Sequence, residues 1–469
     1  MLKGLKMYKL EEMNDISATD LNKSFSNYIN SPLSSIYKML GLDHFDYSYA
    51  IGSYIYLKNG DKILDFTSSC GALNLGHNHP EIKKAEEFCL QNDIVEMLKF
   101  GNNKLQAMLA NNIAEILPDN LDISFFAVSG AEANEAALKL AKRAQPSYKK
   151  FYVRTTGSFH GKTHGILPFT ESENFNTGFH VGVNPDNVLT IPFNDINALK
   201  NLIKKYTDDG DNKIIALMVE PLQGQEICSA EHGYLRQITE VCQNNNILTI
   251  FDEIKVGLGR TGKLFTFLHE ANCVPDILTF SKSLGGGRRA ISAMTTSSKL
   301  FKKSYGKKLH STLHSTTFGG IGSSCAVAIK TLEIITREDF MSDSNNNSDY
   351  LYDKLAGLAK MFPRDIIEIR GQGFYRGLQI RFPHKKMTDI NLPYANKFEI
   401  ACMGSIVREL FREYNILTFF TGAAPDVLHI MPPINTTKSE IDYFINSLTD
   451  LFEKNIYILL KKFIKGTIL

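Results

Sequence analysis

Residues 276–293 read DILTFSKSLGGGRRAISA, and this stretch decides how the rest of the chain is interpreted. A short β-type run, ILTF, leads to a single lysine, Lys282, and three consecutive glycines follow at 285–287. Lysine prefers water, and a run of glycines costs backbone entropy on folding. The stretch therefore predicts a functional site at the end of a strand rather than a piece of the hydrophobic core.

The sequence around this stretch predicts an α/β fold. Between about residues 120 and 330, apolar β-type runs alternate with longer helical patterns; the clearest runs are DISFFAV (122–128), IIALMVEP (214–221), ILTIFDE (247–253) and DILTFSK (276–282). Apolar runs without polar alternation, separated by helices, are typical of a mostly parallel sheet covered on both faces. Ligands of such sheets bind at the carboxyl ends of the strands.

The whole chain divides into three expected parts. We expect an N-terminal arm with part of a small domain over residues 1–100, a large domain over 101–330, and a small α+β domain over 331–469. A final packing helix is expected from about 438 to 465, and the tract DSNNNSD at 343–349 is expected to be an exposed loop.

Composition points to a small-molecule role. The 52 basic and 50 acidic residues are interspersed and leave a net charge of +2, so no footprint for nucleic acid is present. The seven cysteines are scattered without a C-x-x-C pair, which argues against a disulfide framework or a zinc site and favours the reducing cytoplasm. No apolar stretch reaches membrane-spanning length, and we expect neither secretion nor a transmembrane helix.

Chemically suggestive groups follow four of the expected strands. Ser129 and Gly130 form a turn before a helix that begins near Ala131, so free N–H groups and a helix dipole predict a phosphate site, although S-G is also a common helix cap. Asp252 follows an apolar run, and a poorly solvated carboxylate needs a metal or a protonated nitrogen as its partner. The protonated nitrogen is favoured, because no cluster of His or Cys residues lies near Asp252 in the sequence.

The other two strand ends add an amine and an aromatic ring. Desolvation of Lys282 would lower its pKa and make it the nucleophile of Schiff-base chemistry, whereas a lone lysine is more often a surface residue. Phe159 and His160 lie in a glycine-rich turn, where the phenyl ring is either core or a stacking surface for a flat ligand. A phosphate, a flat ring with a basic nitrogen and a carbonyl together predict pyridoxal 5'-phosphate (PLP).

From about residue 50 to 445, the chain resembles the class III PLP-dependent aminotransferases of fold type I. This group includes ornithine, acetylornithine, 4-aminobutyrate and putrescine aminotransferases. Eight stretches carry the resemblance in the family's order: DFTSSCGALNLGHNHPEI (65–82), SGAEANEAALKLAKR (129–143), GSFHGKTHG (157–165), VEPLQGQ (219–225), FDEIKVGLGRTGKLF (251–265), PDILTFSKSLGGG (275–287), HSTTFGG (314–320) and IRGQGFYRGLQI (369–380).

The resemblance implies a role for each cofactor residue. Lys282 would form the Schiff base with PLP and then shuttle a proton, while Asp252 would keep the ring nitrogen protonated. The further cofactor-binding positions implied are Ser129, Gly130, Ala131, Phe159 as the stacking ring, His160, Glu220 and Lys255. Thr317 would reach the phosphate of the neighbouring subunit, which implies an obligate homodimer with shared active sites. The H-x-H pair His77 and His79 matches a structural turn of the family rather than a metal site.

Departures from the family pattern bear on the substrate. Relatives usually have a glutamate where this chain has Gln225, and it pairs with an arginine where this chain has His429. Loss of both partners is physically consistent, because a single remaining charge in the pocket would lack compensation. A histidine cannot reproduce the bidentate grip of arginine on a carboxylate, so either glutamate is not the amino donor or another cation holds it.

Candidates for that other cation are Arg288, Arg289 and Lys255. Relatives usually have glutamine at the position of Lys255, so this lysine either favours the phenolate of the cofactor or turns toward solvent. Cys70, where relatives often have a bulkier residue, either widens the substrate entrance or serves packing.

The sequence therefore predicts a transaminase that acts on a primary amine or aldehyde together with an amino or keto acid, in a biosynthetic pathway. A conventional diamine or ω-amino-acid:2-oxoglutarate aminotransferase is the alternative. A racemase or aminomutase on the same scaffold is a further one, since these enzymes share the cofactor. A non-catalytic cofactor-binding protein is the contrasting possibility, against which Lys282 and Asp252 argue.

Overall fold

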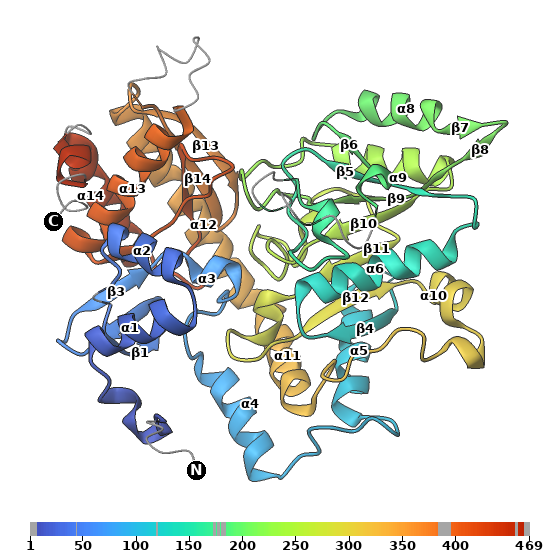
Figure 1. Ribbon diagram of the computed structural model, residues 1–469, viewed down its shortest axis with the longest axis horizontal. Helices are drawn as coiled ribbons and strands as arrows, with labels where there is room; N and C mark the ends of the chain where they lie inside the picture. Colours follow the sequence, from blue (N-terminus) through green and yellow to red (C-terminus); the bar gives the residue numbers. More distant parts are fainter. Residues whose placement is uncertain are drawn as a thin grey trace.

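The computed structural model describes residues 7–43, 45–118, 121–171, 175, 179, 184–382, 395–454 and 458–463. Figure 1 shows two lobes: one holds the large sheet, and the other contains both the N-terminal and the C-terminal segments. Chain ends that are far apart in sequence thus build one lobe together.

A seven-stranded sheet forms the centre of the larger lobe. Its order is β4-β12-β11-β10-β9-β5-β6, with bounds β4 Ile123–Ala127, β12 Ser292–Thr296, β11 Ile277–Phe280, β10 Leu248–Asp252, β9 Ile214–Val219, β5 Phe151–Thr155 and β6 Val188–Ile191. The run from β11 to β6 is parallel, while β12 is antiparallel to both β11 and β4. The predicted mostly parallel sheet is confirmed.

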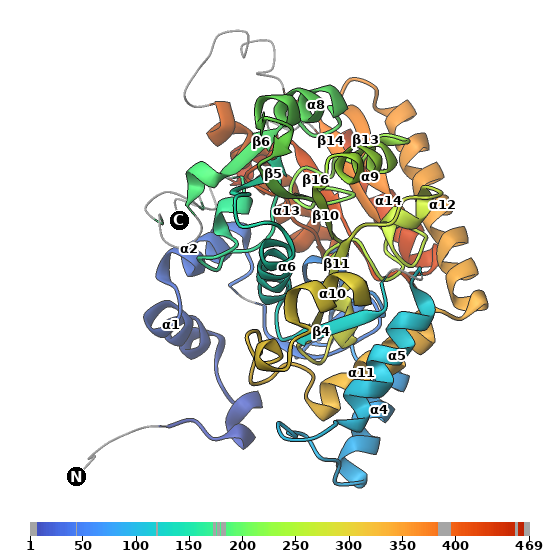
Figure 2. The same ribbon diagram turned by 90° about the vertical axis from the view of Figure 1, so that its right-hand side faces the viewer.

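Helices cover both faces of this sheet, as Figures 1 and 2 show. One face packs against α6 (Gly130–Ala144) and α10 (Ser298–Tyr305), and the other against α5 (Lys104–Ile116), α8 (Ile196–Lys205), α9 (Tyr234–Asn244) and α11 (Gly322–Ile335). Every residue of β9 is buried, and its side chains divide between two different core clusters. An unbroken apolar run is what a strand buried on both faces requires.

The smaller lobe combines segments from both ends of the chain. An antiparallel sheet of β13 (Ile366–Gln372), β14 (Tyr375–Ile380) and β16 (Val427–Ile430) packs with α12 (Glu338–Met361), α13 (Ala395–Tyr414) and α14 (Lys438–Glu453). A second sheet contains β1 (Tyr47–Ile51), β2 (Tyr54–Leu57), β3 (Lys62–Asp65) and β15 (Ile416–Leu417), and α1 (Ala18–Tyr28) and α2 (Ser31–Leu40) lie beside it. The pairing of β15 with β3 joins the two ends of the chain.

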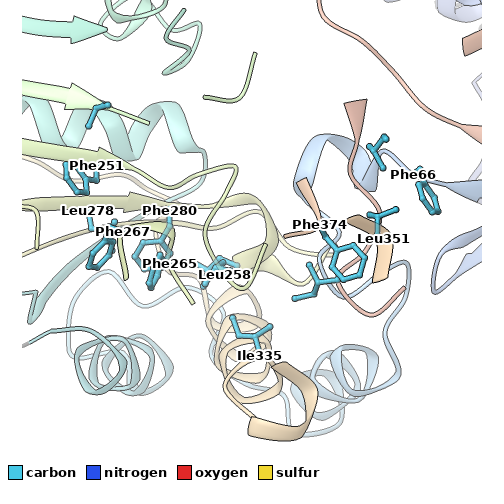
Figure 3. Close-up of a cluster of buried hydrophobic side chains, with 14 of the residues drawn as sticks. Phe66, Phe251, Leu258, Phe265, Phe267, Leu278, Phe280, Ile335, Leu351 and Phe374 are labelled. Carbon is cyan, nitrogen blue, oxygen red and sulfur yellow. The ribbon is translucent and has the colours of Figure 1, made fainter. Parts of the chain in front are cut away.

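The hydrophobic core continues from the sheet into the smaller lobe. Figure 3 shows Phe251, Phe265, Phe267 and Phe280 on the sheet side and Phe66, Leu351 and Phe374 on the other. Arg260, fully buried, connects the lobes further: its guanidinium donates to the carbonyls of Phe374 and Pro432 and to the amide oxygen of Asn74. These hydrogen bonds link the two lobes to each other.

The three glycines behind Lys282 allow close packing. They end the short helix η5 (Lys282–Gly285), and Gly286 and Gly287 have positive φ values of 57° and 73°. A Cβ on Gly287 would lie 2.3 Å from the Leu73 side chain, and one on Gly286 would lie 3.0 Å from Ile82 of α4 (Pro80–Gln91). The glycines therefore bring the turn after Lys282 against its neighbours.

Some expectations differ from the structure. The tract at 343–349 is not a loop but part of α12, because Ser344, Ser348 and Leu351 pack on its buried face and override the poor helix propensity of asparagine and serine. The final helix is confirmed from Lys438 but α14 ends at Glu453; residues 455–457 and 464–465 of the predicted span lie outside the described residues.

The predicted division at residues 100 and 330 stays a prediction, and residue 330 lies inside α11. Among the described residues, no helix is both long and apolar enough to cross a membrane.

Candidate active site

Six of the seven strands of the large sheet point their carboxyl ends at one edge. β6, β5, β9, β10 and β11 are parallel, and β4 has the same direction because β4 and β11 are both antiparallel to β12. Residues at or shortly after the ends of β4, β5, β9, β10 and β11 line one cavity of about 460 Å³: Gly130, Ala131, Phe159, His160, Glu220, Gln225, Asp252, Lys255 and Lys282. The fold thus brings most of the predicted cofactor residues to one cavity, whereas Ser129 and Thr317 do not line it.

Asp252 ends β10 and is held from three directions. Its Oδ2 accepts hydrogen bonds from Nδ1 of His160 and from Nδ2 of Asn134, each at 2.7 Å, and its Oδ1 accepts from the N–H of Ile254 at 3.0 Å. The carboxylate is 4% exposed. These three hydrogen bonds fix the direction of the buried carboxylate.

Lys282 follows β11 on a strained backbone. Its φ of 48° is a left-handed conformation, which costs a non-glycine residue about 1–2 kcal/mol. Burial lowers the pKa of the amine, and the carboxylate of Asp252 partly opposes this effect. A lysine with a lowered pKa is a better nucleophile and proton acceptor at neutral pH.

The start of α6 presents two backbone donors to the same cavity. Ser129 caps the helix: its Oγ accepts from the N–H of Glu132, whose carboxylate accepts in return from the N–H groups of Val128 and Ser129. This capping box does not use the first-turn N–H groups of Gly130 and Ala131, and both residues line the cavity. An anion fits there, at the positive end of the helix dipole.

Two glycines allow close packing around the start of α6. A Cβ on Gly130 would lie 2.8 Å from Ile254, and one on Gly161 would lie 2.7 Å from Ile166 and 2.9 Å from Ala131. Larger side chains at either position would therefore push these neighbours away from the helix start.

Glu220 shapes a wall of the cavity. Its carboxylate accepts from the N–H groups of Phe159 and Gly224, each at 2.9 Å, and so fixes the loop that carries the Phe159 ring. Burial raises the pKa of Glu220. Glu220 thus lines the cavity and supports Phe159, and its predicted role in cofactor binding stays a prediction.

The substrate candidates divide into those inside the cavity and those behind it. Gln225, Lys255 and Cys70 line it, whereas His429 is fully buried beyond Phe419, with ring centroids 4.6 Å apart. Burial, with the ammonium of Lys255 as a further cause, holds the pKa of His429 well below its usual value. His429 is thus a neutral residue that packs behind Phe419 and does not line the cavity.

Cys70 lies on an unusual turn. Ser68, Ser69, Cys70 and Gly71 (α3, Ser68–Gly71) all have positive φ, between 44° and 88°. Consecutive left-handed residues other than glycine are strained and cluster at functional sites. The turn presents the exposed Cys70 to the cavity.

Arg288 and Arg289 lie elsewhere. They line a second cavity on the other side of Lys282, and both guanidinium groups pair with Glu86 of α4, Arg289 at 2.7 Å. Arg288 also donates to the side chain of Asn78. The structure thus does not bring these arginines to Gln225 or Lys255.

Thr317 is also distant from the Lys282 cavity in its own chain. It is exposed beside Lys99 and Gly101, where the loops 96–103 and 315–321 border a separate hollow. A role for Thr317 at a cofactor phosphate therefore requires a second copy of the chain.

Several side chains around the site were missed from the sequence. Asn134 is the most important of them, and its only sequence signal is a polar residue in the alanine-rich stretch AEANEAA. Phe419 and Thr421 come from the smaller lobe and line the cavity, and the buried Tyr375 donates to the carbonyl of Gly224 in the cavity wall; only the folded chain brings these residues to the site.

Comparison with known proteins identifies the family. The chain belongs to the class III aminotransferases, whose family model matches residues 40–452. It is 30% identical to the aminotransferase PigE of Serratia sp. over 474 aligned positions, which cover 94% of this chain and 54% of PigE. The chain thus spans about half the length of this curated relative.

Solved structures agree with that assignment. One is the ornithine aminotransferase of Toxoplasma gondii with partial occupancy of PLP at its active site: TM-score 0.72, 25% identity, 87% of this chain and 89% of that chain covered. A transaminase of the marine bacterium Virgibacillus shares the fold, with a TM-score of 0.79 at 22% identity over 94% of this chain and 99% of that chain. The expected fold type I architecture is confirmed.

The cofactor of this family is PLP, and the cavity fits it. The N–H cradle at Gly130 and Ala131 suits the phosphate, the fixed carboxylate of Asp252 suits a protonated ring nitrogen, and Lys282 lines the same space. An aromatic face, Phe159, completes the set.

Proposed function

We propose that this protein is a PLP-dependent aminotransferase that moves an amino group between a primary amine or aldehyde and an amino- or keto-acid partner. The observation that carries the proposal is the single cavity in which Lys282, Asp252 and the start of α6 meet. Its substrate side supports a donor without a carboxylate, because no arginine is among the described residues that line it. Its place in a biosynthetic pathway stays a prediction.

Each residue has one task in this proposal. PLP, when bound, supplies an aldehyde that bonds to amines and a ring that accepts the electron pair released as a proton leaves the adjacent carbon. Asp252, oriented by His160 and Asn134, would face the ring nitrogen and favour its protonated form. The Nζ of Lys282 would hold the cofactor through its aldehyde carbon and would be the group that takes and returns a proton.

The alternatives share this machinery and differ in the partner. A conventional 2-oxoglutarate-linked enzyme needs partners for two carboxylates; besides Lys282, Lys255 is the only lysine or arginine among the described residues that line the cavity, and neither Gln225 nor the neutral, buried His429 supplies a second cation. A racemase or aminomutase needs no amino acceptor at all. The requirement for an acceptor therefore separates a racemase or aminomutase from an aminotransferase.

The proposal includes a homodimer with shared active sites. Its support is the exposed position of Thr317, away from the cavity that Lys282 lines. We also propose a cytoplasmic location, which the seven unpaired cysteines support.

Transfer of labelled nitrogen tests the proposal. Incubation of the PLP-loaded protein with ¹⁵N-pentylamine and either pyruvate or 2-oxoglutarate should give ¹⁵N-alanine or ¹⁵N-glutamate by mass spectrometry. Lys282→Ala should lower the rate by about 10²–10⁴, the usual contribution of a proton-transfer group. A Lys282→Ala protein with full activity, or conversion of the amine without any acceptor, would contradict the proposal.

A further inference from the structure

The proposed function leaves the carboxylate of the amino- or keto-acid partner without an assigned cation. A carboxylate in a poorly solvated cavity needs a positive or hydrogen-bonding partner, since desolvation without one costs several kcal/mol. Among the described residues that line the cavity, the only lysines or arginines are Lys282 and Lys255. Lys282 is committed to the cofactor in the proposed function.

The other candidate cations are accounted for. Arg288 and Arg289 are paired with Glu86 at the second cavity, and His429 is a neutral imidazole behind Phe419. Lys255 is therefore the remaining side chain on the substrate side.

The amine of Lys255 is held in a defined place in the cavity wall. Its Nζ donates to the carbonyl of Gly224 at 2.5 Å and lies 4.7 Å from the centroid of the Tyr375 ring and 5.7 Å from that of Phe419. An ammonium has three N–H donors, so donors remain for a ligand after the bond to Gly224. The aromatic faces stabilise the charged form at this position.

The space for the lysine stem depends on Gly224. A Cβ on Gly224 would lie 2.8 Å from Cδ of Lys255. Tyr375 also donates to the carbonyl of Gly224, at 2.7 Å, so the ring and the amine share one acceptor. Lys255 is thus fixed against the wall instead of turning to solvent.

We propose that Lys255 is the cation that binds the carboxylate of the amino- or keto-acid partner, in place of an arginine. This inference rests on the proposed function, because it names the group that holds one of the two substrates.

The charge on Lys255 depends on its neighbours. Burial is the main cause that lowers its pKa to about 7, and the amine of Lys282 lowers it further. The titratable groups that face it are Lys282, Cys70, Glu220, Arg260, Tyr375 and His429. A bound carboxylate favours the charged form of Lys255 and so counteracts the effect of burial on its pKa. Carboxylate binding should therefore be coupled to proton uptake by Lys255 as the pH rises through that pKa.

Unreactive ligands test this inference separately from catalysis. Calorimetry with the PLP-loaded protein would compare butanoate and glutarate with butanamide, a neutral match for butanoate, between pH 6 and pH 8.5. Carboxylate affinity should fall about tenfold as the pH rises from about 6 to about 8, on either side of the pKa of Lys255. Butanamide binding should show no such dependence, and buffers with different ionisation enthalpies should report proton uptake for the carboxylates alone.

Variants assign the effect to Lys255. Lys255→Met should weaken carboxylate binding at least tenfold at pH 6 and remove its pH dependence, whereas Lys255→Arg should keep binding and lose the pH dependence. Lys162→Met removes a cation above the Phe159 and Phe175 rings, outside the cavity lining, and should bind like the wild type. Retention of the PLP absorbance shows that each variant is folded.

Two results would overturn the inference. One is unchanged carboxylate affinity in Lys255→Met; a change in the pH titration of the PLP absorbance in that variant would then assign Lys255 to the cofactor instead. The other is a loss of binding that follows Arg288→Met or Arg289→Met. Failure of the wild type to transfer ¹⁵N from pentylamine would instead contradict the proposed function, so the two failures are distinguishable.

Discussion

Asp252 and Glu253 are neighbours in sequence, but the fold gives their carboxylates different surroundings. Asp252 faces the cavity and accepts hydrogen bonds from His160, Asn134 and Ile254. Glu253 points into the core, is 1% exposed, and accepts from the N–H of Phe267 at 2.8 Å. Burial raises the pKa of Glu253 from its ordinary 4.5 to about 7.

This raised pKa predicts a pH-dependent stability. Between pH 4.5 and 7 the folded chain keeps a proton on Glu253 that the unfolded chain releases, so the free energy of unfolding decreases as the pH rises through this window. The decrease should be about 3 kcal/mol, because each tenfold difference in proton affinity between the folded and unfolded chain corresponds to about 1.4 kcal/mol. Glu253→Gln should remove it in denaturant unfolding at pH 5 and pH 7.5.

The exposed Glu240→Gln serves as the control, because it lies on the surface of α9. If Glu253→Gln and Glu240→Gln change the pH dependence equally, burial of Glu253 is not its cause.

The position of a single residue in the site could be predicted only where the neighbouring sequence has a recognisable pattern. Lys282 and Asp252 each follow an apolar strand, so their positions could be predicted. Asn134 could not be selected from AEANEAA, because its partners His160, Asp252 and Thr279 come from other strand ends. The placement of His429 behind Phe419 likewise depends on the packing of the smaller lobe.

At the scale of elements, α6 connects the phosphate cradle to Asp252. Its N-terminus carries the capping box of Ser129 and Glu132, and Asn134 lies one turn further along. The Nδ2 of Asn134 donates to the carbonyl of His160 at 2.8 Å and to Asp252, and its Oδ1 accepts from the hydroxyl of Thr279 at 2.7 Å. One helix thus fixes both ends of the cofactor site.

Asn134→Ala should weaken this connection. Buried groups that lose a partner cost about 1–3 kcal/mol each, so we expect a loss of about 2–4 kcal/mol in the free energy of unfolding. We also expect the rate of amine conversion to fall more than PLP occupancy falls, since Asp252 loses a donor but stays in place.

Stopped-flow absorbance and cofactor titration measure the two effects. Asn92→Ala, at the exposed end of α4, is the control and should cost less than about 1 kcal/mol. A variant whose amine conversion falls only in proportion to PLP loss would assign Asn134 a purely structural role.

The amino-acid composition of residues 343–349 wrongly predicts a loop. DSNNNSD has the residues of a loop, but α12 continues through it because its small serines pack against the core. The strands of the large sheet were predictable, since apolar runs buried on both faces need no knowledge of their neighbours. Helix α12 was not, because its stability comes from tertiary packing.

At the scale of the whole molecule, one surface carries large apolar side chains. Val95, Phe100 and Phe318 are 65%, 97% and 59% exposed, and their loops lie together because the N–H of Gly322 donates to the carbonyl of Glu96. Thr317 belongs to the same surface. Clustered exposed apolar side chains are typical of a protein interface.

The proposed dimer predicts a consequence of mutating this surface. Phe100→Asp should place a charge in the interface and dissociate the dimer, as observed by analytical ultracentrifugation, and activity should fall with it because Thr317 is proposed to act across the interface. Met361→Asp, 58% exposed on α12, is the control and should remain dimeric. A wild-type protein that is a fully active monomer would disprove the shared site.

We propose that the Lys282 cavity accepts amines without a carboxylate. Absorbance spectroscopy tests this by following the visible band of the PLP-loaded protein while pentylamine is added without any keto acid, with alanine and glutamate in parallel. Pentylamine should remove the visible band in the wild type but not in Lys282→Ala. A band that responds to alanine or glutamate and to no carboxylate-free amine would contradict this proposal.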